Sequence, residues 1–145
     1  MKFISIAEIE YLAFNLAKET MDFNEPIPAF STRFPNILES CLGTPLQGFS
    51  GKSLYHGLIA KAAILFYLMV KNHPFQNGNK RIAMTTLFVL LYKNKEWLKV
   101  DNQELYNFAK FIAESAAKYK DQMIGIIEKF IQDGLINLPN RETNA

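Results

Sequence analysis

The chain has 145 residues, of which 49% are hydrophobic, and a formal net charge of +2. These values are typical of one soluble domain with a real core, and they argue against a nucleic-acid binder with a basic face. The single cysteine, Cys41, excludes an internal disulfide and a cysteine metal cluster, and we expect it to be buried. No signal peptide is evident, and the apolar run 58–70 is too short to span a bilayer, so we expect a cytoplasmic protein with no membrane contact.

Two helices are predicted in the first third of the chain. Residues 5–8 have the spacing of a capping box, which begins a helix that we expect to end near Thr20. Two prolines in segment 21–30 interrupt any regular pattern there. Pro35 suits the first turn of a short second helix, and Gly43 should end it.

Residues 43–55 are rich in glycine, and we interpret them as a loop or a poor hairpin. Two apolar side chains, Leu46 and Phe49, lie within this segment. Because the segment directly precedes a long helix, it can overhang a binding site as a flap. The alternative is a plain surface loop whose Phe49 packs back onto the core.

Two long segments, 54–72 and 80–93, are apolar on almost every face. Helices of that kind lie at the centre of a fold, because every face needs a neighbour. We therefore predict two central buried helices joined by a short polar loop.

Two more helices with apolar stripes follow, one capped at residues 101–102 and one over about 121–132, which Gly134 should end. No convincing strand and no internal repeat is found. The predicted fold is therefore all-α, a compact bundle of about six helices. We expect a single domain over residues 1–136 and a loose tail over 137–145.

The polar segment 73–81, His-Pro-Phe-Gln-Asn-Gly-Asn-Lys-Arg, is the most informative part of the chain, and we call it the motif segment. Pro74 should stop the first central helix just before it. Asn79 can cap the second, which leaves the N–H groups of the first turn free for an anion. Lys80 and Arg81 oppose the helix dipole, which favours a phosphate that offsets them. The alternative is a helix stop, a turn and a solvated cation pair.

The motif segment resembles the signature of the Fic/Doc family, His-Pro-Phe-x-(Asp/Glu)-Gly-Asn-(Gly/Lys)-Arg, at every position except Asn77. The resemblance covers about residues 30–132. Lys80 in place of glycine, and the lack of a second arginine three residues after Arg81, are similar to the Doc (death-on-curing) toxin branch. That branch implies transfer of the γ-phosphoryl group of ATP or another nucleoside triphosphate, with Mg²⁺, to a hydroxyl of a translation elongation factor.

The resemblance also implies roles within the motif segment. His73 would be the general base, a role that suits imidazole because it titrates near neutrality. The backbone N–H groups of Gly78, Asn79 and Lys80 would hold phosphate oxygens, and Asn79 could also fix the loop through its side-chain amide. Lys80 and Arg81 would neutralise the charge that develops during transfer.

Three further roles are implied outside this set. Asn77 stands where the family has an acid, so it would be a weak Mg²⁺ ligand, directly or through water. Phe75 would anchor the loop in the core. Leu46 and Phe49 would belong to a flap that holds the target polypeptide.

Alternatives remain at the level of function. One is a Fic-type AMP transferase, which differs in the phosphate that is attacked. Another is an inactive nucleotide- or partner-binding module, because Asn77 lacks the charge of the usual acid. The family's inhibitory pattern, (Ser/Thr)-x-x-x-Glu, does not occur in the chain. We therefore expect restraint by an antitoxin in trans, and no direct binding of nucleic acid.

Overall fold

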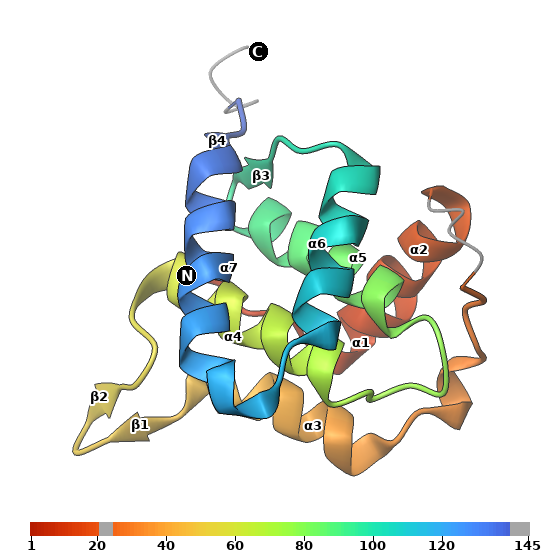
Figure 1. Cartoon of the computed structure of the whole chain (residues 1–145), viewed down its shortest axis with the longest axis horizontal. Coiled ribbons are helices and arrows are strands. Elements are labelled where there is room, and N and C mark those ends of the chain that lie inside the picture. The colour runs from red at the N-terminus through yellow and green to blue at the C-terminus, as the bar shows by residue number, and fades with distance from the viewer. Residues whose placement is uncertain (21–24, 140–145) are drawn as a thin grey trace.

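The computed structural model describes residues 1–20 and 25–139. Within these residues the fold is a helical bundle, as predicted (Figure 1). The helices are α1 (Ile6–Glu8), α2 (Phe14–Thr20), α3 (Pro35–Gly43), α4 (Gly57–Lys71), α5 (Asn79–Lys93), α6 (Asn102–Glu114) and α7 (Lys120–Gly134). The strands are β1 (Gly48–Phe49), β2 (Lys52–Ser53), β3 (Glu96–Leu98) and β4 (Leu135–Asn137).

The N-terminal helix consists of α1, a π-helical turn at Ile9–Ala13, and α2. Its predicted capping box is confirmed, since the Ser5 hydroxyl accepts from the Glu8 N–H at 3.2 Å and the Glu8 carboxylate accepts from the Ser5 N–H at 2.9 Å. The two reciprocal bonds between Ser5 and Glu8 satisfy two backbone donors that would otherwise be unpaired at the start of this helix.

The predicted irregular segment 21–30 has no regular structure over 25–29, and residues 21–24 lie outside the described part of the chain.

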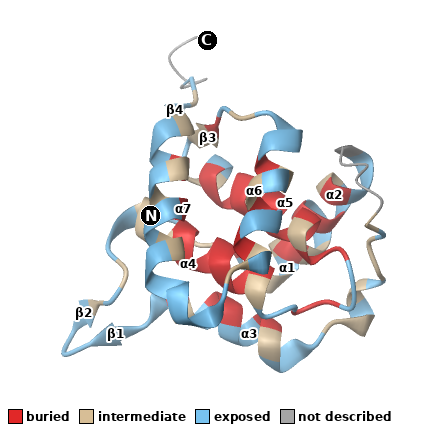
Figure 2. Cartoon of the chain, viewed as in Figure 1, coloured by how far each residue is buried: buried red, intermediate tan, exposed pale blue. Residues whose placement is uncertain are grey.

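Helices α4 and α5 form the centre of the molecule, as predicted. They pack against each other, α3, α6 and α7 contact α4, and α2 and α6 contact α5. Figure 2 shows that the buried residues concentrate on these two helices. Every residue of α4 from Ala62 to Val70 is buried, which is the physical meaning of its all-round apolar sequence.

The expectation that the chain contains no convincing strand is wrong, although the hairpin that we considered for residues 43–55 is present. Strands β1 and β2 form an antiparallel hairpin with Phe49 opposite Lys52, and β3 pairs antiparallel with β4, Trp97 lying opposite Ile136. Strands of two or three residues are too short to show the period-two pattern by which strands are recognised in a sequence.

Strand β4 fixes the end of the described chain. Asn137, where we expected a loose tail to begin, is the last residue of β4, and the N–H of Leu138 donates to Lys95 O at 2.9 Å. The ordered structure therefore extends past residue 136, and residues 140–145 lie outside the described part.

The fold bears on two further expectations, those about membrane-spanning helices and about Cys41. No helix among the described residues is long and apolar enough to cross a membrane. Cys41 is buried in α3 as expected, and burial raises the pKa of its thiol to about 11. A thiol of that kind is inert at neutral pH in the folded protein.

Candidate active site at the start of α5

The loop of residues 72–78 connects α4 to α5 and places His73 at the end of α4. The predicted stop is confirmed, because Asn72 is the C-cap and its N–H donates to Leu68 O at 2.9 Å. His73 itself has a φ of 51°, in the left-handed region that residues other than glycine rarely adopt. Its side chain is exposed. Strained, exposed residues of this kind cluster at functional sites.

Asn79 holds the loop in shape, but it is not the helix cap that we predicted. The N-cap is Gly78, and Asn79 is the first residue of α5. The buried Asn79 carboxamide accepts from the Phe75 N–H at 3.0 Å and donates to the Phe75 carbonyl at 2.9 Å. These bonds hold the carboxamide in the loop, so it cannot reach the N–H groups of its own helix.

The same carboxamide also contacts the histidine. Asn79 Nδ2 lies 3.4 Å from His73 Nδ1. An amide N–H at that place favours the tautomer in which Nδ1 accepts and the proton is on Nε2. To take a proton on Nε2, the ring must therefore change tautomer or rotate when a substrate binds.

Phe75 lies in the core, 1% exposed. Its ring meets the Phe14 ring edge-on with centroids 5.0 Å apart, and the Phe30 ring at 6.3 Å. The neighbouring carbonyl of Pro74 accepts from the Phe34 N–H at 2.8 Å. The middle of the loop is thus attached to both the N-terminal helix and the segment before α3.

Gly78 lies under the segment that follows the N-terminal helix. It has a φ of 72°, and a Cβ at this position would lie 2.9 Å from Pro26 O and 2.8 Å from Ile27 Cδ1. Both its backbone conformation and its close contacts therefore require glycine. The first N–H groups of α5 have no intrahelical acceptors, and Gly78 has no side chain with which to cap them.

Lys80 pairs with a glutamate that sequence analysis did not single out. Lys80 Nζ lies 3.6 Å from Glu25 Oε2, and the Tyr106 hydroxyl donates to the same oxygen at 2.9 Å. Burial, this hydrogen bond and the Glu25 charge raise the pKa of Tyr106 to about 12, so the phenol stays a donor. At 3.6 Å the ammonium is beyond a normal hydrogen bond to Glu25 and keeps donors for another anion.

Arg81 is buried, 7% exposed, against the N-terminal segment. Its guanidinium donates to the Ala17 carbonyl at 2.5 Å through Nη2 and to the Glu25 carbonyl through Nη1, while its buried Nε has no partner among the described residues. In this structure the hydrogen bonds of Arg81 connect the N-terminal part of the chain to α5. Its role as a phosphate ligand stays a prediction.

Asn77 is exposed at the outer edge of the loop. Its Oδ1 accepts from the Gly78 N–H at 2.8 Å, so the oxygen expected to meet a metal faces the backbone of its own loop. The described residues contain no group of three or more side chains that could hold a metal ion. Within the described residues, the loop therefore offers no cluster of ligands already arranged for Mg²⁺.

The hairpin of β1 and β2 does not overhang the motif segment. It precedes α4, whereas the loop follows α4, and it projects from the body at the other end of that helix (Figure 1). Leu46 is 54% exposed and Phe49 76% exposed, so the alternative in which Phe49 packs on the core is wrong. Their role in target binding stays a prediction.

A model of the Fic/DOC family matches residues 3–91. The chain belongs to the Fic/DOC family. The match starts earlier than the resemblance seen in the sequence and ends within α5, so α6 and α7 lie outside it. No curated protein and no solved structure matches the chain. Membership in the Fic/DOC family indicates a transferase that uses a nucleotide to modify proteins.

Glu25 and Tyr106 are the residues of this Fic/DOC site that sequence analysis missed. Glu25 belongs to an irregular proline-rich segment with no periodicity, and Tyr106 follows Leu105 in the amphipathic α6. Neither position carries a local signal, because Glu25 meets Lys80, and Tyr106 meets Glu25, only through the tertiary fold. Of the two residues, only Glu25 lies within the residues that the family model matches, so the sequence comparison points to Glu25 at most.

Proposed function

We propose that this Fic/DOC protein is a Doc-like toxin that transfers the γ-phosphoryl group of a nucleoside triphosphate to a hydroxyl of a protein target. The proposal rests on one arrangement. The Asn79 carboxamide holds His73 beside the uncapped first turn of α5, from which Lys80 projects. A base next to an anion-binding helix end is what phosphoryl transfer to a hydroxyl requires.

The reaction needs little covalent chemistry from the protein. The target hydroxyl oxygen attacks the γ-phosphorus, the bond from phosphorus to the β,γ-bridging oxygen breaks, and the nucleoside diphosphate leaves. The hydroxyl proton goes to His73, whose ring must first change tautomer or rotate so that an unprotonated nitrogen faces the hydroxyl. Lys80 and the N–H groups of Asn79 and Lys80 offset the negative charge on the phosphoryl oxygens. The Gly78 N–H, which donates to Asn77 Oδ1 in this structure, joins them only if that bond is released.

Two features of the motif segment favour γ-phosphoryl over AMP transfer. Lys80 replaces the glycine that AMP transferases of the family usually carry, and no second arginine follows Arg81 at the usual spacing. The resemblance to the Doc branch supports a translation elongation factor as the target, and with it a reaction in the cytoplasm. The same resemblance, with the missing inhibitory pattern, supports an antitoxin that restrains the protein in trans.

The residues present do not fit a resident Mg²⁺ site. Asn77 is neutral, and its oxygen is used by Gly78. Mg²⁺ commonly binds through nucleotide phosphates with few protein ligands, so a metal that arrives with the nucleotide is compatible with the loop. We assign no step of the reaction to it.

Asn77→Asp should strengthen the Mg²⁺ dependence of ATP binding in calorimetry, and an unchanged dependence would show that position 77 does not face the metal.

The test is label transfer in a lysate of the host cells. Purified protein is incubated with ATP labelled at the γ-phosphate in one reaction and at the α-phosphate in the other. A labelled target band with the γ-label alone is expected. A band with the α-label would replace the proposal with AMP transfer, and ATP binding without any band would favour the inactive module.

A further inference from the structure

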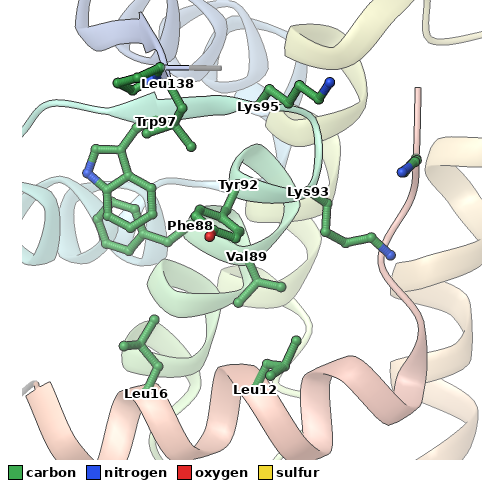
Figure 3. Close-up of a pocket in the computed structure, with 11 residues that line it drawn as sticks. Leu12, Leu16, Phe88, Val89, Tyr92, Lys93, Lys95, Trp97 and Leu138 are labelled. Carbon is green, nitrogen blue, oxygen red and sulfur yellow. The ribbon is translucent and has the colours of Figure 1, made fainter. Parts of the chain in front are cut away.

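A groove lies at the far end of α5 from the motif segment (Figure 3). Its volume is about 910 Å³. Apolar side chains from the N-terminal helix, α5, β3 and the residues after β4 form its walls: Leu12, Leu16, Val89, Tyr92, Trp97 and Leu138. We call it the Leu12–Tyr92 groove. Tyr92 lies near the C-terminal end of α5, about 20 Å along the helix axis from the motif segment at 1.5 Å per residue.

The walls of the groove are apolar and open to solvent. Leu12 is 49% exposed and Tyr92 57% exposed, and in Figure 3 Leu12 and Leu16 point from the N-terminal helix towards α5. Leu12 belongs to the π-helical turn Ile9–Ala13. Such turns are rare and are found often at functional sites. An exposed apolar groove of this size marks an interaction site more often than an accident of packing.

The rim of the groove is basic. Lys2, Lys93 and Lys95 line it, and no acidic residue does. Lys93 already pairs with Glu8 at 2.6 Å. Lys2 and Lys95 are exposed, and neither has an ion pair within the described residues. Two uncompensated cations beside an apolar groove are complementary to an apolar segment that carries carboxylates.

The shape of the groove favours a helix as its occupant. Leu12 and Leu16 are four residues apart on one helix, and Val89 and Tyr92 are three apart on another, so they form the side-chain ridges between which a third helix can pack. The C-terminal sequence 140–145, Asn-Arg-Glu-Thr-Asn-Ala, has no large apolar side chain to fill it.

We propose that the Leu12–Tyr92 groove docks an amphipathic helix of a partner protein, with apolar residues in the groove and Asp or Glu against Lys2 and Lys95. This is the helix-in-groove mode of recognition. The proposal does not depend on the transfer reaction, because it concerns the opposite end of α5.

Trp97 provides the readout, because it is the only tryptophan in the chain and it lines the groove. A phage library of random helical peptides is panned against the intact protein, and enriched peptides are synthesised. Selected sequences should combine apolar residues at helical spacing with Asp or Glu. On binding they should shift the Trp97 emission to the blue, and added salt should weaken them.

Matched variants locate the binding site. Leu12→Lys, and the pair Lys2→Glu with Lys95→Glu, should each weaken the peptides about tenfold or more. The controls Phe111→Lys, and Lys110→Glu with Lys118→Glu, change exposed residues outside the groove and should leave affinity unchanged.

Three results would overturn the proposal. The first is that no peptide is enriched, or that the peptides bind the groove variants as well as the wild type. The second is that phosphatidylglycerol vesicles, rather than peptides, shift the Trp97 emission, which would assign the groove to a lipid surface. The third is a concentration-dependent dimer in light scattering that Leu12→Lys abolishes, which would assign the groove to a second copy of the chain.

Discussion

The carboxamide of Asn79 does two things at the residue scale. It bonds to both backbone groups of Phe75, and it presents Nδ2 to His73. The chemistry of the loop therefore depends on a side chain that need not touch the substrate. The sequence suggested two uses for Asn79. The helix cap is wrong, although it is the common use of asparagine before a helix, whereas the expectation that its amide fixes the loop is confirmed.

Replacing Asn79 by alanine should destabilise the fold. The change leaves the buried N–H and carbonyl of Phe75 without partners, and the free energy of unfolding should fall by about 2 kcal/mol or more. Urea denaturation measures the difference. Asn77→Ala is the matched control, because Asn77 is exposed and bonds only to the N–H of its neighbour Gly78. Equal losses in the two variants would contradict the account of the loop.

At the scale of elements, α5 begins close to the position that the sequence predicted, but contacts with residues far away in the sequence also help to fix this start. A turn glycine was expected at position 78 from Asn-Gly alone. The structure adds that Pro26 and Ile27 lie against this glycine. Helix ends marked by local chemistry, such as Ser5 and Gly134, were predictable, and the glycine-rich segment 43–55 already suggested a hairpin, which β1 and β2 form. The pairing of β3 with β4 was not predictable, because these two strands lie about forty residues apart in the sequence.

Gly78→Ala should therefore destabilise the protein. The left-handed backbone alone costs a residue with a Cβ about 1–2 kcal/mol, and the contacts with Pro26 and Ile27 add to this. Gly125→Ala in α7 is the control, because nothing lies within 4 Å of its Cβ and alanine there should stabilise the helix by up to about 1 kcal/mol. Thermal unfolding of the two variants should shift in opposite directions. A neutral Gly78→Ala would mean that the segment at 26–27 does not pack on the loop.

At the scale of the whole molecule, contacts between residues far apart in the sequence join the N-terminal part of the chain to α5, one set near the start of α5 and one near its end. Arg81 bonds to Ala17 and Glu25 near the start of α5, and Lys93 pairs with Glu8 near its end. The hydrophobic patterns of the sequence predicted the bundle of helices, but they did not predict these hydrogen bonds and this ion pair. Lysines, arginines and glutamates carry no sequence signal of which opposite charge they meet. The same limit explains why Glu25 was missed at the site.

The Glu8–Lys93 pair should give a pH-dependent part of stability. Burial alone raises the pKa of Glu8, but the hydrogen bonds from Lys93 and Ser5 and the charge of Lys93 outweigh it and lower that pKa below its usual value. A depressed folded-state pKa stabilises the protein above the unfolded-state pKa of about 4.3, and the contribution disappears as pH falls through the folded-state pKa.

Glu8→Gln keeps the capping geometry and removes the charge. Its free energy of unfolding should lie about 0.5–1 kcal/mol below that of the wild type at pH 7, and the gap should close below about pH 4. Glu39→Gln, on an exposed residue with no ion pair within the described chain, should show no such gap. A Glu8→Gln gap that is constant from acid to neutral pH would rule out the linkage.

The most direct measurement of the central claim compares label transfer from γ-labelled ATP by the wild type, His73→Ala and His56→Ala. The chain has two histidines, and His56 is exposed at the start of α4, away from the motif segment. We predict that His73→Ala folds normally and binds ATP but labels no target, whereas His56→Ala labels it as the wild type does. Labelling that persists in His73→Ala would remove His73 from the mechanism and contradict the account.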